Sequence, residues 1–218
     1  MSHHVPDIRT FREFVDHMPD ARARYIAMLL YLTGARASEV CTTINKYDEQ
    51  HQRSKPYGQY LQERIADYQN DKVLLIELAT AKKKRVPKKA EYVPRLIALP
   101  TDPAYEPWTK SLLQRIVKRG TLSLDVTPSR IYQIVKTNMR ELDETIHPHA
   151  LRSYRVTHLG FHYEFTPYDL VSFAGWSLKN AFGYARLPVA SSMRYYLNLS
   201  WQMYYPKLRK NLFSIMYS

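Results

Sequence analysis

The sequence has 218 residues, of which 45% are hydrophobic, so it can bury one substantial core and is too apolar to be disordered over most of its length. Its 32 Lys and Arg residues outnumber its 20 Asp and Glu residues, and the resulting net charge of +12 favours an anionic partner, with nucleic acid ahead of a membrane surface. The single cysteine, Cys41, excludes an intramolecular disulfide and a cysteine-based metal site, and no apolar stretch reaches the roughly 20 residues that span a bilayer. We therefore expect a soluble protein of a reducing, intracellular compartment.

The first third of the chain predicts two helices and a polar segment. Apolar residues recur at helical spacing over residues 11–18. Residues 25–32 are apolar on nearly all sides, which predicts a buried helix that ends at Gly34. Residues 45–70 are polar and poor in large aliphatic side chains, so we expect a surface insertion that is partly helical around residues 57–68.

After residue 70 the spacing of apolar residues predicts a β-hairpin followed by several helices. Two short apolar runs, 73–76 and 92–99, flank the basic stretch 82–89 and predict two antiparallel strands joined by a basic turn. From about Trp108 onward the spacing of apolar residues predicts helices at 112–117, 128–142, 148–163, 167–173 and 203–218. Pro128, Pro148 and Pro167 stand where a first helical turn would begin, a position that tolerates proline. The predicted fold class is mainly α with a small antiparallel β-sheet (α+β).

A candidate phosphate site follows the buried helix. Arg36 lies just after Gly34 and before a new helix, for which Ser38 is the expected N-cap. An arginine beside the free N–H groups of a helix N-terminus is suited to a phosphate, and Glu39 is close enough to orient the guanidinium. Taken alone, a surface pair of Arg36 and Glu39 is the simpler interpretation.

A second candidate pair lies at the start of the helix predicted after Pro148. His149 and Arg152 are three residues apart and share one helix face. Phosphoryl transfer needs a proton carrier beside a cation that neutralises the oxyanion, and this pair could supply both. A histidine and an arginine at this spacing also occur by chance in many proteins.

Two further features complete the pattern. A lysine of the basic turn could enter a DNA groove and protonate a leaving oxygen, although a solvated turn explains most of these lysines. The C-terminal part is rich in tyrosine, and a phenol becomes a nucleophile when its neighbours ease the loss of its proton. The chain has 18 tyrosines, so most of them must be packing or surface residues.

The order of these motifs resembles the tyrosine recombinase (phage integrase) family over roughly residues 8–205. The motifs are Thr-Gly-Ala-Arg-Ala-Ser-Glu at 33–39, a lysine on the hairpin, His-Ala-Leu-Arg at 149–152, Ala-Gly-Trp-Ser at 174–177 and Arg-Tyr-Tyr-Leu-Asn-Leu-Ser at 194–200. The two arginine-bearing motifs stand about 110 residues apart, which is of the order usual in the family. The long polar segment after Arg36 and the Ala-Gly-Trp motif look most like integrases of archaeal plasmids and viruses, and hence of mobile elements.

The resemblance implies the tyrosine recombinase catalytic-domain fold and a site-specific recombinase or integrase that cleaves and rejoins DNA through a 3′-phosphotyrosine intermediate. It implies that Arg36 and Arg152 hold the scissile phosphate and that His149 manages the proton of the nucleophile. Trp176 would hydrogen-bond a phosphate oxygen, and Glu39 would support Arg36. Neither a metal nor another cofactor is implied, because two arginines would supply the positive charge.

The resemblance leaves the identity of the catalytic lysine open. Three successive lysines end the first predicted strand, and the register of that strand decides which one points inward. We predict Lys82, with Lys84 on the same strand face by alternation. The remaining basic residues of the turn are expected to contact DNA: Lys83, Lys84, Arg85, Lys88 and Lys89.

The nucleophile is likewise open among three tyrosines. Tyr196 has the local sequence that best resembles the family pattern, and we predict it as the nucleophile. Tyr184 follows Trp176 at nearly the usual spacing, whereas Tyr196 requires an insertion around residues 183–190, which are rich in loop formers. Tyr195 is the remaining alternative.

The resemblance also implies a partner and an assembly. Double-stranded DNA is the expected partner, in a cytoplasmic, nucleoid-associated protein without a membrane role. The helix expected at 203–218 could pack into a neighbouring subunit of a homotetramer on DNA, or fold back on its own core in a protein that is a monomer when free. We expect residues 1–218 to form a single catalytic domain that lacks the N-terminal DNA-clamp domain usual in the family.

Two other functions remain alternatives. A type IB-like topoisomerase would cut and reseal one strand by the same chemistry without strand exchange. A basic DNA-binding protein could keep the fold without catalysis, but such a protein has no need of the complete set of Arg36, His149, Arg152 and Trp176.

Overall fold

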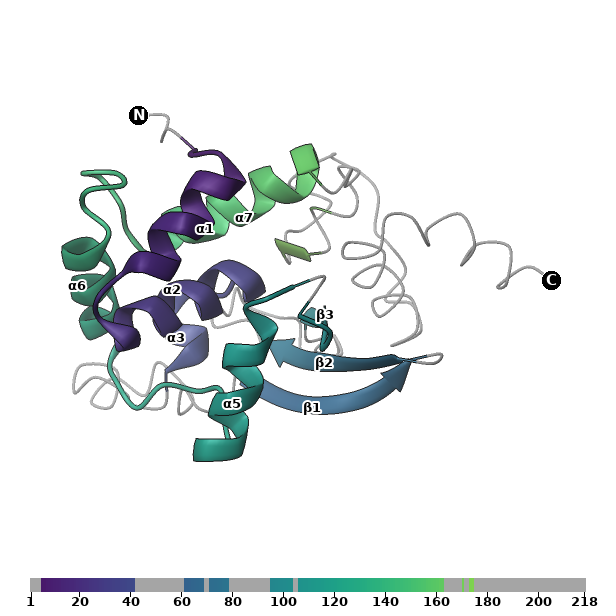
Figure 1. Ribbon diagram of the computed structural model, residues 1–218. Helices are drawn as coiled ribbons and strands as arrows, with labels where there is room; N and C mark the ends of the chain where they lie inside the picture. The colour runs from purple at the N-terminus through teal and green to yellow at the C-terminus, as the bar shows by residue number, and fades with distance from the viewer. Residues whose placement is uncertain are drawn as a thin grey trace, which may run out of the picture.

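The computed structural model describes residues 5–41, 61–68, 71–78, 95–103, 106–162, 170 and 173–174. Figure 1 shows the helices gathered on one side of a small antiparallel sheet, with α5 beside the sheet, an α+β arrangement as predicted. In chain order the elements are α1 (Ile8–His17), α2 (Ala21–Thr33), α3 (Ala37–Val40), β1 (Leu61–Tyr68), β2 (Asp71–Leu78), β3 (Arg95–Pro100), α5 (Thr109–Arg119), α6 (Pro128–Asn138) and α7 (Pro148–His162).

Helix α2 is the centre of the helical layer. Its residues 26–33 are all buried, because α1, α5, α6 and α7 pack around it. The carboxylate of Asp20 caps the start by accepting hydrogen bonds from the backbone N–H groups of Arg22 and Ala23. Gly34 ends the helix in the left-handed conformation, with φ of 56°. The predicted buried helix and its glycine stop are confirmed.

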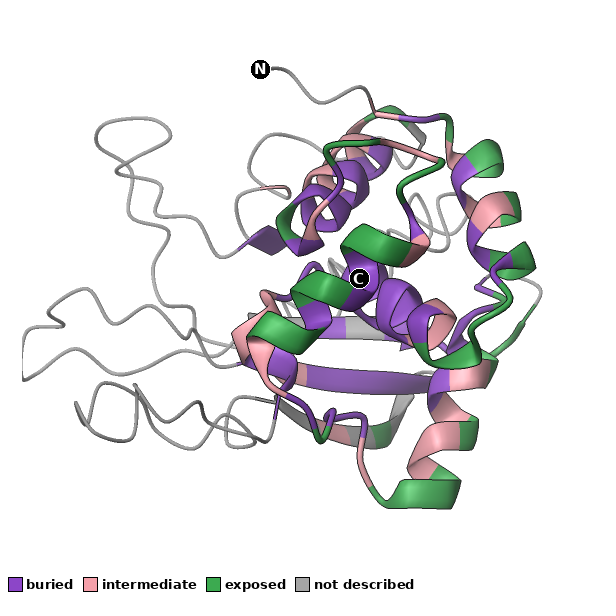
Figure 2. Cartoon of the chain, turned by 90° about the vertical axis from the view of Figure 1, so that its left-hand side faces the viewer, coloured by how far each residue is buried: buried purple, intermediate pink, exposed green. Residues whose placement is uncertain are grey.

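Aromatic rings join α1 and α7 to α2. The ring of Phe11 in α1 lies 4.6 Å from that of Tyr31 in α2 and 5.8 Å from that of Tyr154 in α7, measured between centroids. These rings supply a large part of the apolar area that the layer removes from water. Figure 2 shows the result: buried residues line the inner faces of the helices, and exposed residues form their outer faces.

The sheet has three antiparallel strands in the order β1–β2–β3. β2 pairs with both neighbours, with Ile76 opposite Glu63 on one side and Ile97 on the other. Successive residues 73–76 of β2 are buried, so both of its faces are covered. The predicted strand at 73–76 is therefore confirmed as part of β2, and the strand predicted at 92–99 is confirmed from residue 95 onward as β3. The basic turn and residues 92–94 lie outside the described residues.

The expectation of partly helical structure around residues 57–68 is wrong for residues 61–68, the part that the structure describes. Leu61–Tyr68 forms strand β1, which pairs with β2 along all eight residues. β1 lies at the edge of the sheet, where Ile65 is 55% exposed and Glu63 is half-buried. A strand held mainly by its backbone hydrogen bonds needs few apolar side chains, which is why its composition did not reveal it.

The helix after Gly34 also differs from the prediction. It is a single turn that begins at Ala37, and Arg36 rather than Ser38 occupies the N-cap position. α6 ends at Asn138, before the predicted boundary at 142. The predicted helices at 112–117 and 148–163 are confirmed as α5 and α7, with Pro148 in the first turn of α7 as expected.

The helix predicted at 167–173 is described at two residues, Leu170 and Phe173, and both are helical. Among the residues that the structure describes, no helix combines the length and apolarity that crossing a membrane requires.

Candidate functional site

Arg36 is held by Glu39, as the sequence predicted. The Arg36 Nη1 atom lies 2.7 Å from Glu39 Oε1, and the Arg36 backbone N–H donates to Glu39 Oε2 at 2.8 Å. The Glu39 side chain is fully buried and that of Arg36 is 25% exposed. A buried carboxylate therefore fixes the guanidinium while part of the guanidinium remains open to solvent.

The segment that carries Arg36 is fixed from behind by Arg152. This side chain is buried, and its Nη1 donates to the carbonyl oxygen of Gly34 at 2.7 Å, while its Nη2 donates to the carbonyl oxygen of Ala174. Phe173 lies so close to Gly34 that an added Cβ would come within 2.7 Å of the Phe173 ring. Arg152 therefore ties α7 to the end of α2 and to residues 173–174.

The start of α7 lies beside the Arg36 segment. α7 begins at Pro148, and the rings of His147 and His149 are stacked with centroids 6.3 Å apart. The Ala150 backbone N–H donates to His147 Nδ1 at 3.0 Å, which caps the first turn. His149 is exposed, so its ring is accessible to a ligand.

Arg36 and His149 line one open hollow of about 780 Å³, here called the Arg36 hollow. Its walls come from the start of α3, the first turns of α6 and the start of α7, and its lining residues are Arg36, Ala37, Pro128, Ser129, Tyr132, Gln133, His147, Pro148 and His149. Two motifs that are far apart in the sequence thus meet around one space. Arg152 is not among the lining residues, so in this structure it supports the hollow from behind.

Sequence reasoning missed the contribution of α6. Ser129, Tyr132 and Gln133 line the hollow at helical spacing, and each carries a hydrogen-bonding group suited to a nucleic acid backbone or base edge. Tyr132 is 46% exposed although it is large and apolar in part. The available signal was the run of exposed polar residues three and four positions apart directly after Pro128.

Buried polar groups connect α7 to α2 farther along α7 from the hollow, and the sequence did not reveal them. The Tyr31 hydroxyl lies 2.9 Å from His158 Nδ1, and His158 Nε2 lies 2.8 Å from the carbonyl oxygen of Pro6. Because a carbonyl only accepts, His158 Nε2 must carry the hydrogen of that bond. The guanidinium of the fully buried Arg155 lies 4.9 Å from the centroid of the Tyr31 ring.

Two described tyrosines are poorly suited to act as a nucleophile. Burial, with the hydrogen bond to Asp143 and its negative charge, raises the pKa of Tyr154 far above the usual range. Burial also raises the pKa of Tyr25, with Glu63 adding to the rise and Arg115 opposing it. Both phenols are therefore held in the protonated form, which does not attack phosphorus readily.

The other predicted site residues lie outside the described residues. They are the hairpin residues Lys82, Lys83, Lys84, Arg85, Lys88 and Lys89, the tryptophan Trp176, and the candidate nucleophiles Tyr184, Tyr195 and Tyr196. Within the described ranges, no three His, Cys, Asp or Glu side chains are arranged to hold a metal ion.

In comparisons with known proteins, no protein-family model matches the chain and no curated protein matches its sequence.

Proposed function

We propose that this chain is the catalytic domain of a site-specific DNA recombinase that cleaves and rejoins strands through a 3′-phosphotyrosine intermediate. The observation that carries the proposal is the shared hollow. Arg36 and His149, about 110 residues apart in the sequence, line one open space, and Arg152 hydrogen-bonds the residue two positions before Arg36. A cation and a proton carrier around a space open to solvent suit an extended phosphodiester.

The proposed first step exchanges one phosphate ester for another. The Tyr196 oxygen attacks the scissile phosphorus, the bond from phosphorus to the 5′ oxygen breaks, and the leaving oxygen takes a proton from Lys82. Arg36 neutralises the charge that builds on the phosphate oxygens, and His149 takes the proton of the phenol. Attack by the 5′ hydroxyl of another strand reverses these bond changes and rejoins the DNA, with Trp176 bound to a phosphate oxygen throughout.

Arg152 has a positioning part in this proposal. Its hydrogen bond to the Gly34 carbonyl fixes the segment that carries Arg36. Its buried side chain does not line the hollow, so a contact with the phosphate requires a rearrangement of the site when DNA binds. The net charge of +12 supplies the long-range attraction to DNA. Assembly as a tetramer on DNA would bring together the strands that are exchanged.

Covalent trapping tests the proposal. The full chain is incubated, with a chelator present, with a pool of randomised duplexes that carry 5′-bridging phosphorothiolates, and adducts are separated on denaturing gels and mapped by mass spectrometry. We expect an adduct on Tyr196 that Tyr196→Phe abolishes and that Tyr184→Phe and Tyr195→Phe retain. An adduct on either of the other tyrosines would keep the function and overturn the choice of nucleophile.

Variants of the hollow separate catalysis from folding. His149→Gln removes an exposed proton carrier, so we expect adduct formation to fall about 100-fold or more with an unchanged free energy of unfolding. Arg152→Gln removes buried hydrogen bonds, and we expect loss of both the adduct and stability. Lys136→Gln, on an exposed position of α6, is the control and should change neither.

The outcomes also distinguish the alternatives. Adducts on DNA with relaxation of supercoiled plasmid and no recombinant product would indicate a type IB-like topoisomerase. DNA binding without any adduct would indicate a catalytically inactive DNA-binding protein and would contradict the proposal.

A further inference from the structure

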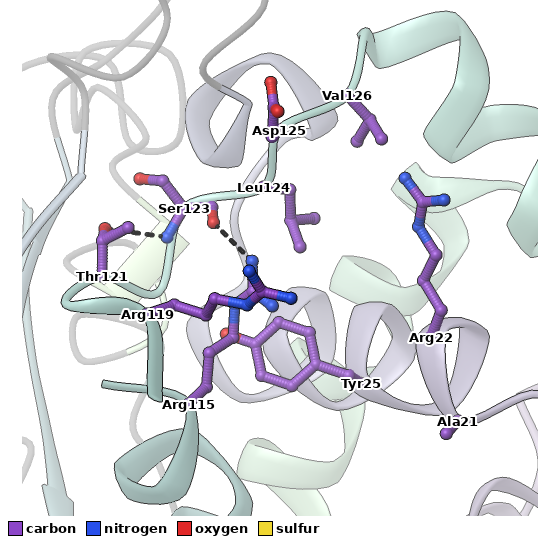
Figure 3. A pocket seen from close by; sticks show the side chains of 10 residues that line it. All are labelled: Ala21, Arg22, Tyr25, Arg115, Arg119, Thr121, Ser123, Leu124, Asp125 and Val126. Carbon is purple, nitrogen blue, oxygen red and sulfur yellow. Dashed lines mark hydrogen bonds between the residues drawn. The ribbon is translucent and has the colours of Figure 1, made fainter. Parts of the chain in front are cut away.

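A second hollow lies at the opposite end of α2 from Arg36. It is about 650 Å³ in volume and is here called the Arg115 hollow (Figure 3). The start of α2, the end of α5 and the segment after α5 form its walls, and its lining residues are Ala21, Arg22, Tyr25, Arg115, Arg119, Thr121, Ser123, Leu124, Asp125 and Val126. Because α2 has 13 residues, each rising about 1.5 Å along the axis, roughly 20 Å separates its two ends. The two hollows are therefore separate sites.

Arg115 forms a rigid wall of this hollow. Its guanidinium lies 4.7 Å from the centroid of the Tyr25 ring, and its Nη2 donates to the Ser123 carbonyl oxygen at 2.9 Å. The Tyr25 hydroxyl in turn donates to the Leu122 carbonyl oxygen at 3.0 Å. The Nε atom of Arg115 is buried and has no hydrogen-bond partner within the described residues. A buried donor in this state is costly, and a shift of the Arg115 side chain toward an acceptor in the hollow would relieve that cost.

Two further arginines face the same space. Arg119 follows Arg115 by four residues and so lies on the same face of α5, and Figure 3 shows Arg22 across from them on α2. Both Arg22 and Arg119 are exposed. Within the described residues no ion pair joins any of the three arginines to an acid, since the ion pairs found there are those of Arg12 and Arg36.

The acids near the hollow are either directed away from Arg115 and Arg119 or bound to backbone N–H groups. Asp125 is the one carboxylate among the lining residues, and Figure 3 shows it directed away from Arg115 and Arg119. The carboxylate of Glu63, near Tyr25, accepts the Leu122 backbone N–H at 2.7 Å. That of Asp20 caps α2. Three guanidinium groups therefore face the hollow against one lining carboxylate.

Hydroxyl groups extend the set of donors. The Ser123 backbone N–H donates to Thr121 Oγ1 at 3.1 Å, which leaves the hydroxyl hydrogen of Thr121 available as a donor. Arginine forks bind phosphate oxygens bidentately, and donors that converge from α2, α5 and the segment after α5 suit a group whose oxygens point in several directions, as those of a tetrahedral phosphate do.

We propose that the Arg115 hollow binds a phosphate group, which Arg22, Arg115 and Arg119 would hold. Arg115 and Arg119, four residues apart, repel each other, and the attraction of both to an anion between them offsets this repulsion. Phosphate of this kind can come from a free phosphate compound or from a DNA backbone that passes the far end of α2. The site is independent of the chemistry proposed for the Arg36 hollow.

Calorimetric titration of the full chain with inorganic pyrophosphate, in a phosphate-free buffer of low ionic strength, tests the site. We expect saturable binding that Arg119→Gln weakens about tenfold or more, and Arg22→Gln combined with Arg119→Gln abolishes. Lys118→Gln is the matched control, because Lys118 stands next to Arg119 at the exposed end of α5 and does not line the hollow. It should change the affinity less than twofold.

A parallel titration with a short duplex identifies the source of the phosphate. Pyrophosphate binding that is weakened about tenfold or more in Arg119→Gln and kept in Lys118→Gln supports a free phosphate compound. Failure of pyrophosphate to bind, with duplex affinity that falls further in Arg119→Gln than in Lys118→Gln, supports the DNA backbone. Equal effects of the two substitutions on both ligands would overturn the proposal, whatever the outcome of covalent trapping at the Arg36 hollow.

Discussion

Two features of the structure restrict Gly34 to glycine: its positive φ and its close contact with the Phe173 ring. Gly120 has only the first of them, so comparing the two glycines separates their energetic effects. Gly34 and Gly120 both end helices with positive φ, at 56° and 71°. A Cβ on Gly34 would meet the Phe173 ring at 2.7 Å, whereas a Cβ on Gly120 would meet nothing within 4 Å. The left-handed conformation costs an alanine about 1–2 kcal/mol at either position, and crowding against Phe173 adds to that cost only at Gly34.

We therefore predict that Gly34→Ala lowers the free energy of unfolding by about 1–3 kcal/mol more than Gly120→Ala does. Urea unfolding followed by circular dichroism measures both. Adding Phe173→Leu to Gly34→Ala should restore part of the difference, because the smaller side chain can move away. If both alanine variants lost the same free energy of unfolding, the contact with Phe173 would contribute nothing to the cost of Gly34→Ala.

Glu39 gives a second prediction about a single residue. Glu39→Gln keeps the shape of the buried side chain but faces the N–H groups of Arg36 with an amide that carries donors of its own. We expect a loss of about 1–3 kcal/mol in the free energy of unfolding and weaker DNA binding, since Arg36 is no longer held. Glu141→Gln, on an exposed position, is the control and should cost less than about 0.5 kcal/mol. A Glu39→Gln variant that matches this control in both assays would contradict the role given to Glu39.

Among the elements, α3 can be studied through Cys41, because the reactivity of this thiol reports whether α3 opens. Cys41 directly follows α3, is buried, and donates its thiol hydrogen to the Ala37 carbonyl oxygen at 2.9 Å. The Leu124 backbone N–H donates to the Val40 carbonyl oxygen at 2.7 Å, which ties this segment to the loop before α6. Burial raises the pKa of the Cys41 thiol from 9.0 to about 12.

We predict that Cys41 reacts with a disulfide reagent at about pH 8 at least 100-fold more slowly in the native chain than in urea, because attack requires the thiolate at an accessible sulfur. The folded pKa lies above the unfolded one, so the protonated thiol stabilises the native state fully below about pH 9, and this contribution is lost as the pH rises toward 12. Labelling kinetics with a chromogenic reagent measure the first effect, and urea unfolding at increasing pH measures the second. A native labelling rate within tenfold of the unfolded rate would mean that α3 opens readily.

The helices and strands differ in how well the local sequence predicts them. α2 is apolar on nearly every side and is capped by a glycine, so its burial and its end could be predicted. β1 could not be predicted, because an edge strand owes its place to hydrogen bonds with β2 rather than to an apolar pattern. α3 is one turn long, and its start depends on the bond between Glu39 and the Arg36 backbone, which local preference for a serine cap does not reveal.

At the scale of the whole molecule, the net charge of +12 predicts binding to DNA that depends strongly on salt. Each phosphate contact contributes about −0.9 to the slope of the logarithm of the binding constant against the logarithm of salt concentration. We expect a slope of several units, reduced by about one in Arg36→Gln. Fluorescence anisotropy with a labelled duplex at several salt concentrations measures it, and an affinity that does not change with salt would contradict DNA binding through phosphates.

The sequence alone was enough to predict a mainly helical chain with a small antiparallel sheet, a buried α2 that ends at Gly34, and the pairing of Arg36 with Glu39. Each of these depends on residues within a few positions of one another, where spacing and composition act directly. The tertiary structure alone decided that Arg36 and His149 share a hollow with Tyr132 and Gln133, and that Arg152 stands behind it. It also brought the arginines of α2 and α5 around a second hollow. These groupings arise from how the helices pack, and side chains that meet across a packed core leave no local pattern in the chain.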